Sequence, residues 1–400
     1  MANPKLRFSK QYPDWKFYQI KDIVEVNPYT AELPERFVYI DLESVDRGNL
    51  TATNIIDRRD APSRAQRLIE KDDVLFQLVR PYQQNNLIYS DLCHLPAVAS
   101  TGYAQLRPTK TVTCPSFLYT AIHTKTFLEN VLCRCTGGAY PAINTSDLSE
   151  ISLSMPCLEE QHKIAEFFTT LDEKIRICEA KIDSTERLLA GLMDALFKQK
   201  IRLKNSEGSY YPDWRKSTIG KEGSFHYGKS APKWSLSDEA TTPCVRYGDL
   251  YTKFRYKIDS VNTFTNIDKK DLVFSKGGEV LVPRVGEDPN DFCKCAYLPF
   301  EGIAIGEMVS IYESQHDGMF LSFYFNSQMR KEFAKYVEGG NVSNLYYTYL
   351  EDIEITIPSL EEQKAISEFL TDVVNKLDFL KQSKQKYITL KKAFMQRMFV

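Results

Sequence analysis

Apolar and polar positions follow the same pattern twice along this chain. The first copy reads LSEISLSMPCLEEQHKIAEFFTTLDEKI from Leu148, and the second reads LEDIEITIPSLEEQKAISEFLTDVVNKL from Leu350. Each begins with an alternating run that has the two-residue period of a strand: Ile151, Leu153 and Met155, then Ile353, Ile355 and Ile357. A proline, Leu-Glu-Glu-Gln and a long helical pattern follow. Since an internal repeat sets the architecture, the chain is predicted to contain two similar halves.

In both helical stretches, apolar residues recur at alternating spacings of four and three, which is the a/d seam of a coiled coil. The first seam comprises Ile164, Phe168, Leu171, Ile175, Cys178, Ile182, Thr185, Leu189, Leu192 and Leu196. The second comprises Ile366, Leu370, Val373, Leu377, Leu380, Lys384, Tyr387, Lys391, Phe394 and Met398. The two lysines interrupt the second seam and argue against tight coiling there.

The order of the segments predicts the direction of the helices. A polar stretch, Lys198–Ser209, leads from the first helix into the second half, so that half starts at the far end of the helix. Its own helix must then return, which gives an antiparallel pair and approximate two-fold symmetry. The stretch Ile164–Phe197 would span roughly 50 Å at the helical rise. A DNA turn is about 34 Å, so such a spacer suits two reading heads on one duplex.

Each half opens with Tyr-Pro-Asp-Trp, at Tyr12 and at Tyr211. The middles, 16–147 and 215–349, are rich in Tyr, Phe, Val and Ile between Gly and Pro, which predicts an α+β fold with short strands. We expect strands at Phe37–Leu42, Val74–Val79, Tyr103–Leu106, Val245–Tyr247, Glu279–Val282 and Val309–Tyr312, and helices at Pro115–Val131 and Gly318–Tyr336. The resulting division is 1–150 and 201–350 for the two domains, with 151–200 and 351–400 for the two spacer helices.

Composition narrows the class of protein. The chain is 43% hydrophobic and 26% charged with a net charge of −2, so it is typical of a globular protein and not of a generic polyanion binder. No apolar run reaches the length of a membrane span. The first residues lack the apolar region of a secretory signal, and nine cysteines then indicate reduced thiols. We therefore expect a cytoplasmic protein that does not enter a membrane.

Motifs that carry chemistry are missing from the sequence. Neither a phosphate-binding loop nor a dinucleotide fingerprint occurs, and Asn27-Pro28-Tyr29 is interpreted as a turn. The Cys-x-Cys pairs at Cys133 and Cys293 lack zinc-site spacing, and the five histidines form no ligand pattern. The paired glutamates suit helix N-termini, and Ser359 with Glu362 predicts a capping box. No catalytic residue, metal site or bound cofactor is predicted.

Local groups of Arg, Lys, Tyr, Gln and Asn fit a DNA reader with dispersed contacts, because these side chains pair with base edges and phosphates. The glycine pairs at matching places in both halves allow either close backbone approach to a ligand or a simple turn. The candidates for DNA contact are Arg58, Arg59, Arg64, Arg80, Tyr82, Gln83, Gly137, Gly138, Tyr140, Arg246, Tyr247, Arg255, Lys257, Arg284, Gly339, Gly340 and Asn341.

The pattern as a whole resembles the specificity subunit of Type I restriction-modification systems, over essentially the full length. The duplicated Pro-x-Leu-Glu-Glu-Gln-x-x-Ile element is the most specific feature. Supporting segments are Pro4–Phe8, Asp14-Trp15, Asp73–Phe76, Arg80-Pro81, Ser100–Tyr103, Leu106–Pro108 and the Gly-Gly loops. Cys157 departs from the serine or proline that is usual in the family.

The resemblance implies a bacterial or archaeal protein with two target recognition domains, each reading half of a bipartite double-stranded DNA target. It implies helices that set the gap and dock two modification subunits, and two restriction subunits as further partners. S-adenosylmethionine, ATP and magnesium are then expected on those partners. Two other readings stay open from the sequence: a stand-alone nuclease or metal enzyme on a duplicated fold, and a scaffold that binds proteins only.

Overall fold

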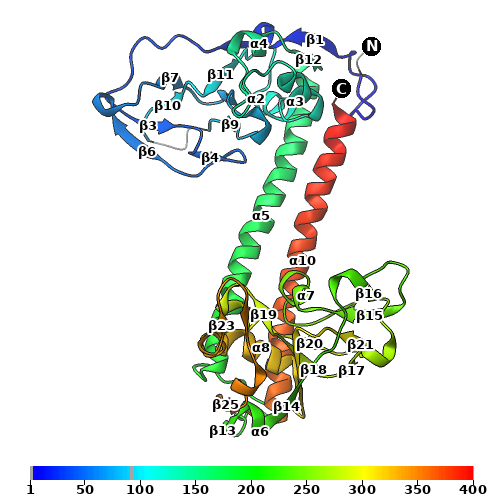
Figure 1. The fold of residues 1–400 in the computed structure, drawn as a ribbon. Coiled ribbons are helices and arrows are strands. Elements are labelled where there is room, and N and C mark those ends of the chain that lie inside the picture. Colours follow the sequence, from blue (N-terminus) through cyan, green and yellow to red (C-terminus); the bar gives the residue numbers. More distant parts are fainter. Residues whose placement is uncertain (1–2, 91–93, 400) are drawn as a thin grey trace. The chain divides into compact units, whose positions relative to one another are not determined.

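The computed structural model describes residues 3–90 and 94–399. The chain forms two compact units, Met1–Glu179 with Gln382–Val400, and Ala180–Lys381. Two long helices, α5 (Leu158–Phe197) and α10 (Leu360–Met398), each contribute one segment to each unit (Figure 1). The division into two domains and two separate spacer helices therefore stays a prediction, because contacts group each domain with parts of both helices. No helix among the described residues is long and apolar enough to cross a bilayer.

The first unit is built on two four-stranded sheets. One has the order β2-β11-β8-β9 and is antiparallel; the other has the order β6-β3-β10-β7, with β3 and β10 parallel. The bounds of the first sheet are Val24–Val26, Tyr103–Pro108, Val74–Gln77 and Leu87–Ile88. Those of the second are Asn54–Asp57, Arg36–Ile40, Ala97–Ser100 and Ala65–Ile69. The short strands β4 and β5 pair at Val45–Asp46 and Asn49–Leu50.

The second unit repeats this plan strand for strand. Its sheets have the orders β14-β22-β18-β20 and β16-β15-β21-β17, again with one parallel pair in the second sheet, β15 with β21. The bounds are Gly223–Tyr227, Val309–Ser314, Glu279–Pro283 and Ala296–Leu298, then Phe264–Thr265, Thr242–Val245, Glu301–Ile305 and Phe274–Lys276. The predicted α+β class and internal repeat are confirmed.

Three of the expected elements are wrong. The strand predicted at Val245–Tyr247 ends at Val245, and Tyr247 begins helix α7 (Tyr247–Thr252), because the Asp249 carboxylate accepts the Arg246 backbone N–H (2.9 Å) at its start. In each half, the one long helix that was predicted is divided into two shorter helices. In the first unit Thr124 caps a new helix by accepting from Phe127 N. The pairs are α2 (Pro115–Ala121) and α3 (Lys125–Leu132), and α8 (Gly318–Gln328) and α9 (Arg330–Lys335).

Smaller elements complete the units. Strands β1 and β12 pair in the first, and β13 and β25 in the second, at Lys16–Gln19, Ser152–Met155, Arg215–Thr218 and Glu354–Ile357. Short helices α1, α4 and α6 lie at Ile20–Ile23, Thr145–Ser149 and Ile219–Glu222. The closing strand of each repeat therefore pairs with the strand that follows its Tyr-Pro-Asp-Trp segment, so both ends of a repeat are joined.

In the first unit, a buried carboxylate joins the two sequence motifs that occur in both halves of the chain. Glu160, from Leu-Glu-Glu-Gln, is fully buried and accepts a hydrogen bond from Nε1 of Trp15, from Tyr-Pro-Asp-Trp (3.2 Å). Arg7 donates two hydrogen bonds to the same carboxylate, from Nε (3.0 Å) and from Nη2 (2.6 Å). A bidentate guanidinium and an indole together compensate the charge that burial would otherwise leave unsolvated.

The second unit has the same arrangement with a looser arginine. Trp214 Nε1 donates to Glu362 (3.0 Å), but Nη2 of Arg202 lies 3.8 Å from that carboxylate. Burial therefore raises the pKa of Glu362 more than Trp214 and Arg202 lower it. The predicted capping box is only half present: Glu362 N donates to Ser359 Oγ (3.3 Å), while the Glu362 carboxylate pairs with Trp214 instead of the Ser359 backbone.

The glutamine of the repeated motif fixes the start of each long helix to its domain. Gln161 accepts from Cys114 N (2.9 Å) and donates to Val112 O (2.9 Å). Gln363 accepts from Asp317 N (2.9 Å), at the start of α8. Both glutamines are buried, so these bonds satisfy polar groups that water cannot reach. The motif is thereby explained as an anchor between helix and domain.

The long helices pack on each other and on the domain cores. In the first unit, Ile164, Phe168 and Leu171 of α5 share a core with Met398 of α10. In the second unit, Leu189 and Leu196 of α5 share a core with Ile366 and Leu370 of α10. Cys178, Ile182, Thr185 and Leu377 are also buried, whereas Ile175, Leu192, Val373, Leu380 and Phe394 are partly buried. The domains thus cover part of each apolar stripe.

The lysines that interrupt the second seam make ion pairs between the helices. In the first unit Lys391 pairs with Asp172 and Lys384 with Glu179 (2.9 Å). In the second unit Lys381 pairs with Glu186 (2.8 Å). Within the first unit, the later lysine of α10, Lys391, pairs with the earlier acid of α5, Asp172. The paired segments of the two helices are therefore antiparallel. The lysines replace apolar contacts by ion pairs and leave the helix pairing intact.

Candidate nucleic-acid interface

Each unit carries a tight hairpin at its Gly-Gly pair. Gly137 has φ +91°, and a Cβ there would lie 2.9 Å from Tyr140 O; Gly339 has φ +122°, and its Cβ would lie 2.7 Å from Val342 O. Only glycine fits both the backbone conformation and the space. The tip residues Tyr140 and Val342 are 64% and 60% exposed. The first glycine of each pair therefore serves the turn, and the turn presents an exposed apolar side chain.

The hairpin is joined to the end of the central strand in both units. In the first, Val79 bridges Ala142 and Arg80 N donates to Pro141 O (2.7 Å). In the second, Leu345 N donates to Arg284 O (2.9 Å), and three short strands form the order β19-β24-β23, at Val285–Gly286, Ser343–Asn344 and Glu338–Gly339. An arginine is thus held beside the hairpin each time.

Arg80 lies on an aromatic ring of its own hairpin. Its guanidinium carbon is 4.2 Å from the centroid of the Tyr140 ring, which is a cation–π contact. Arg80 has the left-handed conformation (φ 53°, ψ 53°) that non-glycine residues seldom adopt. The 3₁₀ turn Pro81–Gln83 follows, with Tyr82 and Gln83 exposed. This group offers one guanidinium, one amide and two rings at a single strand end.

Arg284 lies against two rings in the second unit. Its guanidinium carbon is 4.4 Å from the ring centroid of Tyr227 and 5.3 Å from that of Tyr346. Tyr347 packs on Tyr227, with ring centroids 4.6 Å apart. No described residue accepts from the buried Arg284 Nε. Burial raises the pKa of Tyr227 more than Arg284 lowers it. The rings fix the guanidinium plane without using its hydrogen bonds.

Arg246 and Tyr247 lie near this same end of the second unit. They line a pocket of about 240 Å³ that also includes Val285, the residue after Arg284, and Lys233. Arg255 and Lys257 line a separate pocket of about 270 Å³ with residues of α10 in the same unit, among them Thr371, Asn375 and Asp378. The structure therefore places Arg246 and Tyr247 in one pocket with Val285, the residue after Arg284, and places Arg255 and Lys257 elsewhere in the unit.

The remaining candidates are more exposed. Arg58 pairs with Glu32 (2.5 Å) and lies 3.6 Å from Glu35, so its charge is compensated within the unit. Arg59 is exposed and lies near Asp57 and Asp60, and Arg64 is exposed. Gly138 and Gly340 are the second glycines of their pairs, and a Cβ placed on either would have no atom within 4 Å. Asn341 is exposed. Their role in DNA contact stays a prediction.

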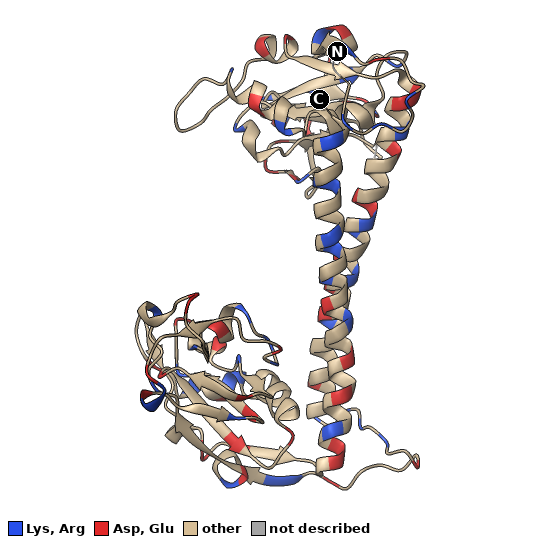
Figure 2. Ribbon diagram, turned by 90° about the vertical axis from the view of Figure 1, so that its right-hand side faces the viewer, with Lys and Arg blue, Asp and Glu red and all other residues tan. Residues whose placement is uncertain are grey.

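Sequence reasoning missed the rings that hold Arg284. Tyr227 ends strand β14, and Tyr346 follows the hairpin, so residues far apart in the chain meet only in the folded unit. A tyrosine at a strand end is too common to signal a cation–π contact. In Figure 2, Lys and Arg are interspersed with Asp and Glu in the ribbon of each unit. Recognition of DNA would therefore depend on local groups and not on one basic face.

Other chemistry has little support in the described part of the chain. No cluster of three or more His, Cys, Asp or Glu residues there could hold a metal ion. Cys293 and Cys295 are buried, and burial raises the pKa of both thiols. Cys133 is exposed at the end of α3. These cysteines are best explained by packing and surface position.

Comparison with known proteins supplies the family context. A family model described as "Type I restriction modification DNA specificity domain" matches residues 12–187 and 212–388. The Haemophilus influenzae Type I restriction enzyme HindI specificity subunit is 28% identical over 196 residues, which are 46% of this chain and 40% of that protein. A Methanocaldococcus jannaschii protein, proposed to be the MjaX specificity subunit, is 25% identical over 423 residues, covering 96% and 92%.

A solved structure has the same fold. The crystal structure of the Type I restriction-modification system S subunit from M. genitalium aligns with a TM-score of 0.63 and 15% identity. The alignment covers 100% of this chain and 99% of that one. The two repeats of the family match also fall one in each half, as the internal repeat predicts.

Proposed function

Because the chain belongs to the family of Type I restriction-modification DNA specificity proteins, we propose that its two units read the two halves of one bipartite, asymmetric DNA target. Specificity subunits recognise the DNA target and are non-catalytic; the enzymatic activities belong to the methyltransferase and restriction subunits with which they work. We propose that S-adenosylmethionine, ATP and magnesium are bound by those partners.

The proposal rests on one observation: the two units share a backbone scaffold but carry different side chains on it. Both units hold an arginine beside a Gly-Gly hairpin at the end of the central strand. Arg80 stacks on Tyr140 in the first, whereas Arg284 stacks on Tyr227 and Tyr346 in the second. Duplicated scaffolds with different exposed groups suit the reading of two different sequences. Arginine held in a fixed plane suits bidentate contact to guanine.

Exchange of one domain tests this reading. Residues 16–147 are replaced by the corresponding segment of a relative with a known target, and methylated motifs are mapped by sequencing DNA from cells with the methyltransferase subunits. We expect one half of the motif to change to that of the relative while the other half and the gap stay the same. A change in both halves, or in neither, contradicts the proposal. The matched exchange of residues 215–349 should alter only the opposite half.

The two long helices are proposed to set the gap between the half-sites and to dock two methyltransferase subunits, with two restriction subunits in the full complex. The support is that α5 and α10 are uninterrupted helices, paired through their cores and lysine ion pairs. Exposed apolar side chains along them, Leu188, Phe369 and Phe379, are suitable for a protein partner.

Lengthening both helices should change the gap alone. One heptad inserted between Cys178 and Leu189, with one at the facing part of α10, adds about 10 Å to each helix, or about three base pairs. We expect the methylated motif to keep both half-sites while its gap grows by about that amount. The same heptad in α5 alone shifts the register against α10 and is expected to abolish methylation. An unchanged gap in the double insertion would contradict the spacing role.

A further inference from the structure

A buried carboxylate in the second unit lacks the counter-charge that its repeat equivalent has in the first. Asp73 immediately precedes β8, and Glu279 is the first residue of β18; the two strands occupy the same place in the two sheets. In the first unit Val74 pairs with Leu106, and in the second Val280 pairs with Tyr312. The next residues along the partner strands are therefore also equivalent. They are Arg107 and Glu313.

In the first unit the carboxylate is fully compensated. Asp73 is buried and accepts from Arg107 through Nε and Nη2, both at 2.9 Å. It also accepts from Gln105 Nε2 (2.7 Å) and from Glu70 N (2.7 Å). A bidentate guanidinium and two neutral donors satisfy a buried carboxylate well. This is the local solution for an acid at the start of the central strand.

In the second unit the side-chain donors are gone, and only the backbone donor is kept, because Lys276 N stands where Glu70 N does. Ile311 stands where Gln105 does, and Glu313 stands where Arg107 does. Glu279 is only 3% exposed, and its one described hydrogen bond is Oε1 with Lys276 N. No described residue donates to its Oε2. A buried carboxylate oxygen without a donor is costly, so the site favours a ligand that supplies one.

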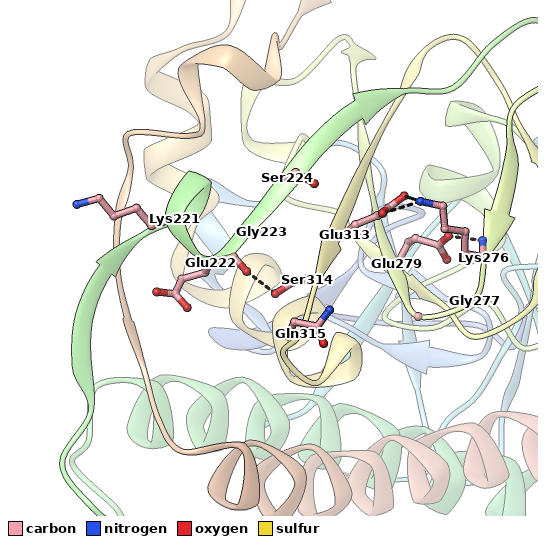
Figure 3. Close-up of a pocket in the computed structure, with 11 residues that line it drawn as sticks. Lys221, Glu222, Gly223, Ser224, Lys276, Gly277, Glu279, Glu313, Ser314 and Gln315 are labelled. Carbon is pink, nitrogen blue, oxygen red and sulfur yellow. Dashed lines mark hydrogen bonds and ion pairs between the residues drawn. The ribbon is translucent and has the colours of Figure 1, made fainter.

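Glu279 lines an open groove of about 510 Å³, shown in Figure 3. The turn before β18 contributes Gly277 and Gly278, and Gly278 has no atom within 4 Å of its Cβ position, so no side chain fills that part. The other walls come from the end of α6 with the start of β14, at Lys221–Ser224, and from the end of β22 with the next residue, at Glu313–Gln315. A groove of this size is large enough to admit a side chain.

The other charges in the groove already have partners or point away. Lys276 Nζ binds both oxygens of Glu313 (2.8 and 2.9 Å). Glu222 pairs with Arg215, which with Ser217 and His316 lowers the pKa of Glu222 to about 2 despite the opposing effect of burial. Lys221 extends away from Glu279 in Figure 3. Among the described residues, Glu279 is thus the groove carboxylate that forms no ion pair, and its charge attracts a cation.

We propose that this groove binds an arginine side chain of a partner protein, whose guanidinium takes the place at Glu279 that Arg107 takes at Asp73. The groove lies at the start of β18, whereas Arg284 follows the other end of that strand. It is thus at the opposite end of β18 from Arg284 and its rings, and its negative charge disfavours phosphate. The occupant is a protein side chain and not nucleic acid.

A capped tripeptide probes the site directly. Acetyl-Gly-Arg-Gly-amide is titrated into the full chain by calorimetry at low salt, beside the same peptide with neutral citrulline. We expect the arginine peptide to bind at least about tenfold more tightly, which corresponds to 1.4 kcal/mol. Glu279→Gln should abolish the preference, while the exposed Glu239→Gln should retain it. Equal binding of both peptides, or a preference that survives in Glu279→Gln, overturns the proposal.

Comparison of the two units suggests a second variant, which adds a guanidinium beside Glu279 and leaves the Glu279 carboxylate in place. Glu313→Arg places an arginine at the position equivalent to 107, where it can pair with Glu279 within the chain. We expect this variant to lose peptide binding and to exchange the amide hydrogens of β17 and β18 about fivefold more slowly. Exchange that is unchanged or faster, or peptide binding that persists in the folded variant, contradicts the assignment.

Discussion

Replacement of Glu160 by alanine is expected to destabilise the first unit by about 3 kcal/mol or more, because removal of one partner of a buried ion pair leaves the other unpaired. The Arg7 guanidinium would lose two hydrogen bonds, and Trp15 Nε1 would lose its acceptor inside the core. The start of α5 would lose its link to the Tyr-Pro-Asp-Trp segment. Urea denaturation, with hydrogen exchange to separate the units, measures the effect.

The neighbouring glutamate is a matched control. Glu159 is in the same motif and turn, but its side chain is 69% exposed and contacts Lys163 and Tyr12 at the surface. Glu159→Ala is expected to leave the stability of the unit nearly unchanged, as is usual for exposed ion pairs. Peptides around Trp15 should lose exchange protection in Glu160→Ala only, and peptides around Trp214 in neither variant. Equal effects of the two substitutions would contradict the anchoring role.

The repeat made much of the fold predictable. Strand–proline–helix elements with a two-residue and then a helical period occur twice, and this signal is local, so α5, α10 and the preceding strands follow from it. The anchoring by Glu160 and Glu362 could not be derived, because their partners Trp15 and Trp214 lie about 145 residues away in the chain. The helix dipole alone accounts for acidic residues at a helix start, so nothing pointed beyond it.

The residue types of the candidate site could be predicted from the sequence, but which of these residues lie together in the fold could not. The Gly-Gly pairs and the arginines after central strands were visible in the sequence, and the folded units place them side by side. Arg255 follows Arg246 closely in the chain, yet helix α7 lies between them and they line different pockets. Sequence proximity therefore grouped residues that the fold separates, and the tyrosines that hold Arg284 were missed.

Arg284→Ala is expected to relax recognition of one half of the DNA target and to weaken specific binding by roughly ten- to a hundredfold, the range for loss of a bidentate base contact. The guanidinium packs against the rings of Tyr227 and Tyr346, which hold its plane before DNA binds. Lysine cannot reproduce a planar, stacked fork. Arg284→Lys should therefore restore little of the specificity although the charge is kept.

Binding is measured by fluorescence anisotropy with the methyltransferase subunits present, on DNA that carries the mapped motif and on single-base variants of each half. Arg36→Ala is the control, because the Arg36 side chain is 65% exposed, lies 3.8 Å from Asp57 and is not among the candidate DNA contacts. We expect it to change affinity less than twofold. Arg80→Ala should relax the other half of the motif. If Arg284→Ala weakened binding equally on all sequences and lowered the salt slope by about one, Arg284 would be a phosphate contact, and the proposed base reading would be wrong.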